Sequence, residues 1–159
     1  MFITNWVNKW RMTARVNDIR AKNGLTPLMR IRSLDKAAYQ HASYMAKTDR
    51  MSHDGFASRV SIIRWQSENP GSKYVGENCG KCAGTLLDTG VVKAAVNRWM
   101  KSDGHRDAIL NPVYNRTGIA SVTNEGNVYI VQVFAGDGVK AGRRLPAVSA
   151  TPAFSGTPQ

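Results

Sequence analysis

Three distant positions in the chain carry side chains that can bind a metal ion or move a proton, each next to a turn signal. His53 comes just before an Asp-Gly pair, Glu77 follows one glycine and His105 follows another. Two imidazoles and one carboxylate can hold a zinc ion and leave a position for water, as in metal-assisted hydrolysis. Only the fold can bring these residues together, and we predict that His53, Glu77 and His105 meet in one surface cleft.

The same three residues allow two outcomes without hydrolysis. The site can bridge to an anionic ligand, or Glu77 can accept hydrogen bonds that orient the two histidines. If the protein is a hydrolase, Glu77 is the strongest candidate for the general base. No nucleophile has a recognisable base, because Ser52 and His53 are adjacent in the sequence, which is not the geometry of a catalytic triad. The sequence therefore favours a non-enzymatic role.

The chain has two cysteines, Cys79 and Cys82, in a C-x-x-C spacing. This spacing fits a redox pair, half of a zinc site or a small disulfide loop, and it excludes a four-cysteine zinc site within one chain. Glycines crowd the segment that follows, which argues against the long helix of a thioredoxin-like motif. We predict a loop pair that forms a disulfide in an oxidising compartment. It should border the cleft, because Glu77 lies just upstream.

Composition and charge restrict the classes of protein that the chain can belong to. Its 159 residues, 42% of them hydrophobic, fit a single soluble domain with a core large enough to need no disulfides. No apolar run approaches the ~18 residues that a membrane span needs. The net charge of +11 predicts attraction to an anionic polymer, an acidic lipid surface or an acidic protein face. No motif specifically supports nucleic-acid binding.

The first residues lack the basic start, the apolar segment and the cleavage site of a secretory signal peptide. We therefore expect a protein that is associated with a particle or released on lysis, and that is otherwise cytoplasmic.

Residues 1–12 are predicted to form an N-terminal arm. Their two tryptophans share one helical face, and this face does not match the apolar stripe that begins at Met12 and continues through Val16. One straight helix would not bury both sets, so the first core helix is predicted over 13–23. The arm is expected to dock into a protein partner or a larger assembly, such as a phage particle. The residues predicted to make this contact are Trp6, Lys9, Trp10, Arg11 and Arg15.

Apolar residues at helical spacing predict three further helices. The first begins at Ser33, ends near Arg50 and carries His41 on its apolar stripe. A lone histidine in such a stripe is interpreted as a hydrogen-bonded core residue. A short helix capped by Asp54 follows, and another covers residues 91–100.

Strand signals occupy the rest of the domain. Residues 74–78 are predicted to be a short strand that leads into a loop at 79–88. Two alternating runs around a glycine-containing turn at 124–126 predict a β-hairpin. The domain is therefore expected to span residues 13–136. Residues 137–159 are rich in Gly, Pro, Ser and Ala, and they are expected to form a tail that is loose unless a partner holds it.

An ordered set of short motifs within residues 13–136 resembles the CAP superfamily. That superfamily includes cysteine-rich secretory proteins, insect venom allergens and plant pathogenesis-related proteins. The motifs are Asn17-Asp18-Ile19-Arg20, Gly24-Leu25-Thr26-Pro27-Leu28, Ala37-Ala38, His41-Ala42, Met45-Ala46, Met51-Ser52-His53, Gly76-Glu77-Asn78, Ala95-Val96, Trp99-Met100 and Gln132-Val133-Phe134. A Trp-Met run followed by Gly-His-Arg and Ile-Leu is typical of the bacterial and bacteriophage branch.

The resemblance implies an α+β fold: an α-β-α sandwich with a small antiparallel sheet between helices and an open cleft. Family members often carry two histidines and two acidic residues in that cleft. His53 matches the first histidine and Glu77 the first acid. The second acid falls on Ser102 and the second histidine near Tyr129, while His105 can substitute, as in the bacterial branch. The resemblance thus implies a metal set of His53, Glu77 and His105, with zinc as the cofactor that such ligands suit. Further cleft residues would be Asn78, Ser102 and Tyr129.

Three functions follow from these observations, and family members are usually extracellular. The favoured one is a CAP-domain binding or scaffold module, with a His/Glu cleft and a basic arm that docks a partner. The first alternative is a metal-assisted hydrolase acting on a cell-wall or protein substrate. The second is a secreted effector that binds a lipid or a glycan.

Overall fold

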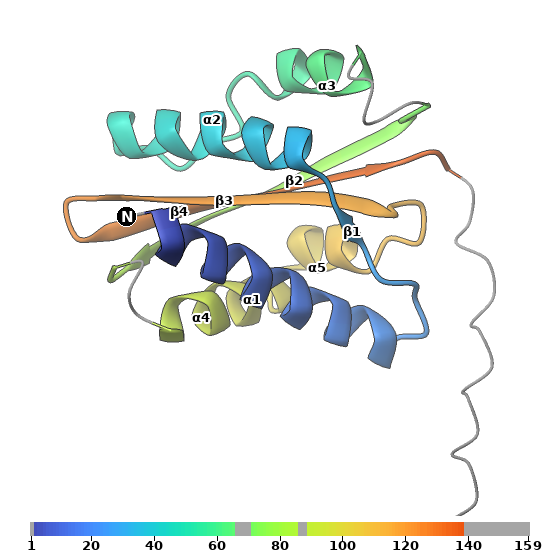
Figure 1. Cartoon of the computed structure of the whole chain (residues 1–159), viewed down its shortest axis with the longest axis horizontal. Coiled ribbons are helices and arrows are strands. Elements are labelled where there is room, and N and C mark those ends of the chain that lie inside the picture. Colours follow the sequence, from blue (N-terminus) through green and yellow to red (C-terminus); the bar gives the residue numbers. More distant parts are fainter. Residues whose placement is uncertain (1, 66–70, 86–88, 139–159) are drawn as a thin grey trace, which may run out of the picture.

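The computed structural model of the chain describes residues 2–65, 71–85 and 89–138. The elements within these ranges are, in chain order, α1 (Phe2–Lys22), β1 (Met29–Arg30), α2 (Arg32–Thr48), α3 (Phe56–Trp65), β2 (Tyr74–Ala83), α4 (Thr89–Met100), α5 (Asp103–Ile109), β3 (Arg116–Asn124) and β4 (Asn127–Gly136). The four strands form one sheet between two layers of helices (Figure 1). α2 and α3 cover one face, and α1, α4 and α5 cover the other. The predicted α-β-α sandwich is confirmed.

The strand order β1-β3-β4-β2 makes β2 an edge strand of the sheet. β3 and β4 are antiparallel and pair as far as Asn124 and Asn127. The two residues between them, Glu125 and Gly126, have φ angles of 47° and 72°. Positive φ at both positions is what a two-residue hairpin turn requires, so the predicted hairpin is confirmed. β2 pairs with β4 along its whole length, whereas β1 is short and parallel to β3.

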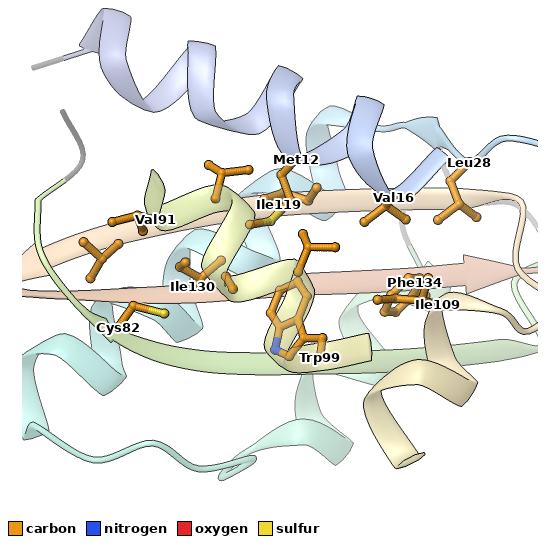
Figure 2. Packing of buried hydrophobic residues seen from close by; sticks show 14 of the residues in the cluster. Met12, Val16, Leu28, Cys82, Val91, Trp99, Ile109, Ile119, Ile130 and Phe134 are labelled. Atoms are coloured by element: carbon orange, nitrogen blue, oxygen red, sulfur yellow. The ribbon is translucent and has the colours of Figure 1, made fainter. Parts of the chain in front are cut away.

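Each face of the sheet has its own hydrophobic core. On the side of α1, α4 and α5, residues such as Met12, Trp99 and Phe134 pack together (Figure 2). On the side of α2 and α3, the core includes Leu34 and Met45, both with 0% exposure. Burying each such large side chain contributes roughly 1.5–3 kcal/mol, so both layers are strongly fixed to the sheet.

Gly118 explains how closely α2 approaches the sheet. A Cβ atom at this position would lie 2.1 Å from the carbonyl carbon of Leu34 and 2.3 Å from the backbone nitrogen of Asp35. Only glycine leaves room for this contact. The backbone N–H of the next residue, Ile119, donates to Asp35 Oδ1 at 2.8 Å, which ties the start of α2 to β3.

α1 is one continuous helix, so the predicted break between an arm and a core helix at residue 12 is wrong. Met12 is 2% exposed and packs with Val16, whereas Trp10 is 61% exposed. The two apolar faces do differ, as predicted, but a straight helix accommodates both because it leaves Trp10 in solvent. None of the described helices is long and apolar enough to cross a membrane.

The basic residues predicted to meet a partner divide into two groups. Lys9 pairs with Asp35 at 3.6 Å, and Arg15 donates to Asn97 Oδ1 at 2.7 Å, so both help to hold α1 on its own domain. Arg11 is exposed beside Trp10. The side chain of Trp6 lies outside the described part of the structure, as does the predicted tail from residue 139 onward.

Arg20 joins the end of α1 to the end of α5 and to the segment that leads into β3. It has 0% exposure, and its guanidinium donates to the carbonyls of Thr26 at 2.9 Å, Ile109 at 2.7 Å, Asn111 at 3.0 Å and Tyr114 at 3.0 Å. Burial lowers its pKa to about 10. The four carbonyls compensate for the water that the charged group gives up on burial.

Candidate functional site

Glu77 is the centre of a polar cluster on β2, and its side chain is only 1% exposed. Arg59 of α3 donates from Nε to Oε2 at 2.9 Å and from Nη2 to Oε1 at 2.7 Å. His53 Nδ1 also donates to Oε1, at 3.0 Å. Two parallel hydrogen bonds are the strongest arrangement of guanidinium and carboxylate, so Arg59 is the main partner of Glu77.

His53 and Glu77 lie in contact, as expected from the sequence, whereas the part of Arg59 was not predicted. The only signal for Arg59 was a basic residue one turn into the helix that starts just after His53. Nη1 of the same guanidinium donates to the Asp54 carbonyl at 2.6 Å, which holds the turn that carries His53. Arg59 therefore positions both the carboxylate and the exposed imidazole.

His41 forms the inner wall of this cluster. Its Nε2 lies 2.7 Å from the Ser52 carbonyl and 3.7 Å from Glu77 Oε1. A carbonyl can only accept, so Nε2 carries the ring proton. Burial lowers the pKa of His41, against the opposing effects of the Ser52 carbonyl and the Glu77 charge. The interpretation of His41 as a hydrogen-bonded core histidine is confirmed.

His105 lies on the other side of β2. Side chains alternate along a strand, so Glu77 faces α2 and α3 while its neighbour Asn78 faces α5. Asn78 Nδ2 donates to the His105 carbonyl at 3.0 Å, and the His105 ring contacts Ser102 Oγ at 3.0 Å through Nδ1. Burial, and then the charge of His53, lower the pKa of His105. The charge of His53 thus affects the protonation of His105 across the edge of the strand. A metal ion shared by His53, Glu77 and His105 remains a prediction.

A cleft of about 530 Å³ follows the open edge of β2. Met51 and Lys81 line it from the side of α2. Arg98, Trp99, Ser102 and His105 line it from the side of α4 and α5, and the remaining walls come from Cys79, Gly80, Ala83 and Asn127. α5 was not expected, since Gly104 beside His105 was interpreted as a turn signal. The predicted cleft residue Ser102 does line this cavity.

A second cavity, of about 360 Å³, lies over the face of Arg59 and His41. It is also lined by Gln40, Tyr44, Asp54 and Gly55. The Tyr44 ring stacks on His41 with 6.0 Å between centroids. Cys79, which lines the first cavity, also contacts Glu77 Oε1, at 3.6 Å. The Glu77 cluster therefore lies between the two cavities.

Tyr129 is fully buried beneath Lys81, whose ammonium lies 5.4 Å from the ring centroid. The Tyr129 hydroxyl donates to Asp49 Oδ1, and Lys81 Nζ donates to the same oxygen at 2.6 Å. The hydrogen bond from Lys81, and then that from Tyr129, lower the pKa of Asp49. This group fixes the end of α2 to the sheet and supports Lys81 at the cleft.

The predicted loop at 79–88 differs from the structure, since β2 extends to Ala83 and includes both cysteines. Cys79 belongs to the core under α2 and Cys82 to the core under α4, and both are free thiols. Residues three apart in a strand point to opposite faces, so the predicted disulfide of Cys79 and Cys82 is absent and the two sulfurs are separated by the sheet. Burial, and then Glu77, raise the pKa of the Cys79 thiol.

His41, Glu77 and Cys79 form a group that could hold a metal ion, with ligand atoms within 4.8 Å of one another. Nitrogen, oxygen and sulfur are the donors that zinc prefers. Their present bonds do not suit a resident ion. Arg59 donates to both oxygens of Glu77, the His41 nitrogen nearest Glu77 carries a proton, and burial raises the pKa of the Cys79 thiol. A metal ion that bound here would compete with Arg59 for the Glu77 carboxylate.

The model of the Cysteine-rich secretory protein family, CAP, matches residues 13–134. The chain therefore belongs to this family, and the resemblance found in its motifs is confirmed. Among curated proteins, the uncharacterized protein YkwD of Bacillus subtilis (strain 168) is 32% identical over 116 residues, which are 73% of this chain and 42% of YkwD. The chain thus spans less than half of the length of that relative.

Solved structures share the fold at low sequence identity. An extracellular protein containing an SCP domain from Bacillus anthracis str. Ames has a TM-score of 0.67 and 22% identity, covering 83% of this chain and 41% of that chain. An outer surface protein of Borrelia burgdorferi has a TM-score of 0.66 and 17% identity, covering 79% and 89%. NaASP2, a structure with Zn²⁺, has a TM-score of 0.59 and 12% identity, covering 79% and 77%.

Proposed function

We propose that the chain is a non-enzymatic binding module of the CAP family, whose ligand lies in the cleft along β2. One observation carries this proposal: both oxygens of Glu77 accept hydrogen bonds from Arg59. A general base must reach the proton that it removes. The Glu77 side chain is 1% exposed, and its carboxylate cannot take a proton without giving up its ion pair. Its carboxylate therefore serves to hold α3 and His53 against the edge strand β2.

The cavities support binding by their size and position. Sites for small ligands usually measure ~300–1,000 Å³ and combine apolar walls with a few polar groups. The cleft of about 530 Å³ has Trp99 and Met51 as apolar walls, and Lys81 and Arg98 as polar ones. Relatives described as extracellular or outer-surface proteins favour a role outside the cell.

The test separates binding from hydrolysis. The full chain is incubated with cell-wall glycan fragments and with peptides, with and without added zinc, and products are sought by mass spectrometry. In parallel, backbone amide signals of cleft residues are followed by NMR. We expect shifted amide signals and no product. A zinc-dependent product that disappears in Glu77→Gln, with the fold of that variant intact, would establish the metal-assisted hydrolase instead.

We also propose that the exposed face of α1 docks a partner. Trp10 is 61% exposed, which leaves a large apolar surface in water, and Arg11 beside it is exposed. Deleting residues 1–12 would not test this cleanly, because Met12 and Lys9 help to hold the domain together. Trp10→Ala with Arg11→Gln removes only exposed groups. It should abolish co-purification with a partner from the native source and leave the melting temperature unchanged. Retained association would rule out this face.

A further inference from the structure

We propose that the cleft along the open edge of β2 is an oxyanion site, which takes a carboxylate or phosphate group of an acidic ligand. Its donors would be Arg98 and the backbone N–H groups of Cys79 and Lys81. The inference rests on the proposed binding function and specifies the chemistry of the ligand.

The pairing of β2 determines where these backbone groups point. Asn78 pairs with Gln132 and Gly80 with Ile130, and further along the same series Gly84 donates to the Gly126 carbonyl at 2.9 Å. Even-numbered residues therefore bond to β4 and its turn. In an antiparallel ladder the residues between them direct both N–H and C=O away from the partner strand. Cys79 and Lys81 thus present their backbone groups at the open edge, where both residues line the cleft.

The acceptors at this edge are already used. The Cys79 carbonyl accepts from Trp99 Nε1 at 2.9 Å, and the Lys81 carbonyl accepts from Arg98 Nη1 at 3.0 Å. The N–H groups of Cys79 and Lys81 have no acceptor among the described residues. The edge therefore offers donors without acceptors. A peptide strand added to a sheet edge needs both kinds of group, so this edge suits a ligand that only accepts.

The charges along the cleft agree with this conclusion. Arg98 and Lys81 line it, and no Asp or Glu is among the lining residues. The Asp49 carboxylate forms an ion pair with Lys81 and so offsets the charge of that lysine. Arg98 is exposed and has no acidic partner in the described part of the chain, so it is the main cation that a ligand would meet. The Arg98 guanidinium can donate two hydrogen bonds to one oxyanion, which lysine cannot do with the same geometry.

The experiment follows backbone amide and indole signals by NMR while a ligand is added to the full chain. The probes are sodium glucuronate and glucose 1-phosphate as the two oxyanions, and glucose as the neutral sugar. We expect the signals of Cys79 and Lys81 to shift with an oxyanion and not with glucose, and the affinity to fall with added salt. Arg98→Gln should weaken binding by at least about tenfold, because a charge-assisted hydrogen bond is lost. Lys93→Gln removes one exposed charge from the same helix away from the cleft, and should change affinity by less than about twofold.

Each result supports the inference or rejects it. Comparing glucuronate with glucose 1-phosphate identifies whether a carboxylate or a phosphate binds. If glucose shifts the same signals equally, or if Arg98→Gln behaves like Lys93→Gln, the oxyanion site is rejected while the binding function stands. If no probe, charged or neutral, shifts any cleft signal, both are rejected.

Discussion

Arg59 holds Glu77 through two hydrogen bonds of 2.7 and 2.9 Å, and this pair connects α3 to the edge of the sheet. Few of the other described side chains of α3 are buried against the rest of the domain. Ile63 is its one fully buried residue there, whereas Ile62 is 53% exposed. The ion pair therefore has a structural role, and the position of α3 depends on it.

The first prediction is that Arg59→Met destabilises the domain. The substitution leaves the buried Glu77 carboxylate without its main partner, and such a loss typically costs ~3–5 kcal/mol of unfolding free energy. Urea unfolding followed by circular dichroism measures it. Arg64→Met is the matched control, since Arg64 is exposed on the same helix and makes one hydrogen bond, to the Lys73 carbonyl. Equal effects of the two substitutions would contradict a structural role for the pair. The double variant with Glu77→Gln should recover part of the loss, because no buried charge remains.

The second prediction concerns zinc. Removing the guanidinium takes away two of the hydrogen bonds that Glu77 accepts next to His53 and Cys79, so Arg59→Met should bind zinc more tightly than the native chain. Isothermal titration calorimetry at neutral pH compares the two proteins, and Arg59→Met with Glu77→Gln is the control that lacks the carboxylate. If the native chain binds zinc as tightly as Arg59→Met, the guanidinium does not compete with the metal.

Part of the fold and part of the Glu77 site could be predicted from the sequence. The layers, the hairpin and the contact of His53 with Glu77 follow from local periodicity, turn residues and ordered motifs. Arg59 could not be found in this way, because its partner lies on a strand that only tertiary folding brings near. The C-terminal half of β2 was missed since its glycine, lysine and alanine residues have weak strand propensity, and pairing with β4 overrides that preference. The break expected in α1 failed because a helix can leave one apolar face, that of Trp10, in solvent.

The third prediction is a pH dependence that comes from His41. Burial lowers its pKa from the ordinary value of 6.5, so below that pH the unfolded chain binds a proton that the folded chain does not. Folding stability should therefore fall as the pH drops below 6.5 and should be fully present above it. His41→Gln keeps a donor for the Ser52 carbonyl and cannot titrate. Urea midpoints at about pH 7.5 and about pH 5.5 should differ less in this variant than in the native chain. An equal loss in both proteins would show that His41 does not contribute.

The fourth prediction is that Cys79 and Cys82 remain free thiols even in air. Both are buried, on opposite faces of the sheet, so neither can reach the other. Alkylation of the native protein should be slow, and two labels should enter after unfolding without reductant. Mass spectrometry counts the labels. A freshly unfolded sample that accepts no label until reductant is added would contradict this arrangement.

The fifth prediction is that Arg20→Met is among the most damaging single changes in the domain. It leaves four backbone carbonyls without their donor, and each unsatisfied buried group costs ~1–3 kcal/mol. Thermal unfolding measures the effect, with Lys22→Met, exposed at the end of the same helix, as the control. Arg20→Lys should fall between the two, because an ammonium has fewer donors and a different shape. A melting temperature for Arg20→Met equal to that of Lys22→Met would contradict this role.

The alternation of side chains along β2 makes the strand unusually sensitive to changes in length. Glu77, Cys79 and Lys81 serve the α2 side of the sheet, while Asn78, Gly80 and Cys82 serve the α4 and α5 side. Inserting or deleting one residue within the strand would exchange the two sets. The carboxylate that Arg59 holds would then point toward Trp99, and Asn78 would turn toward α3. A shift of a single residue would therefore disrupt the contacts on both faces of β2 together.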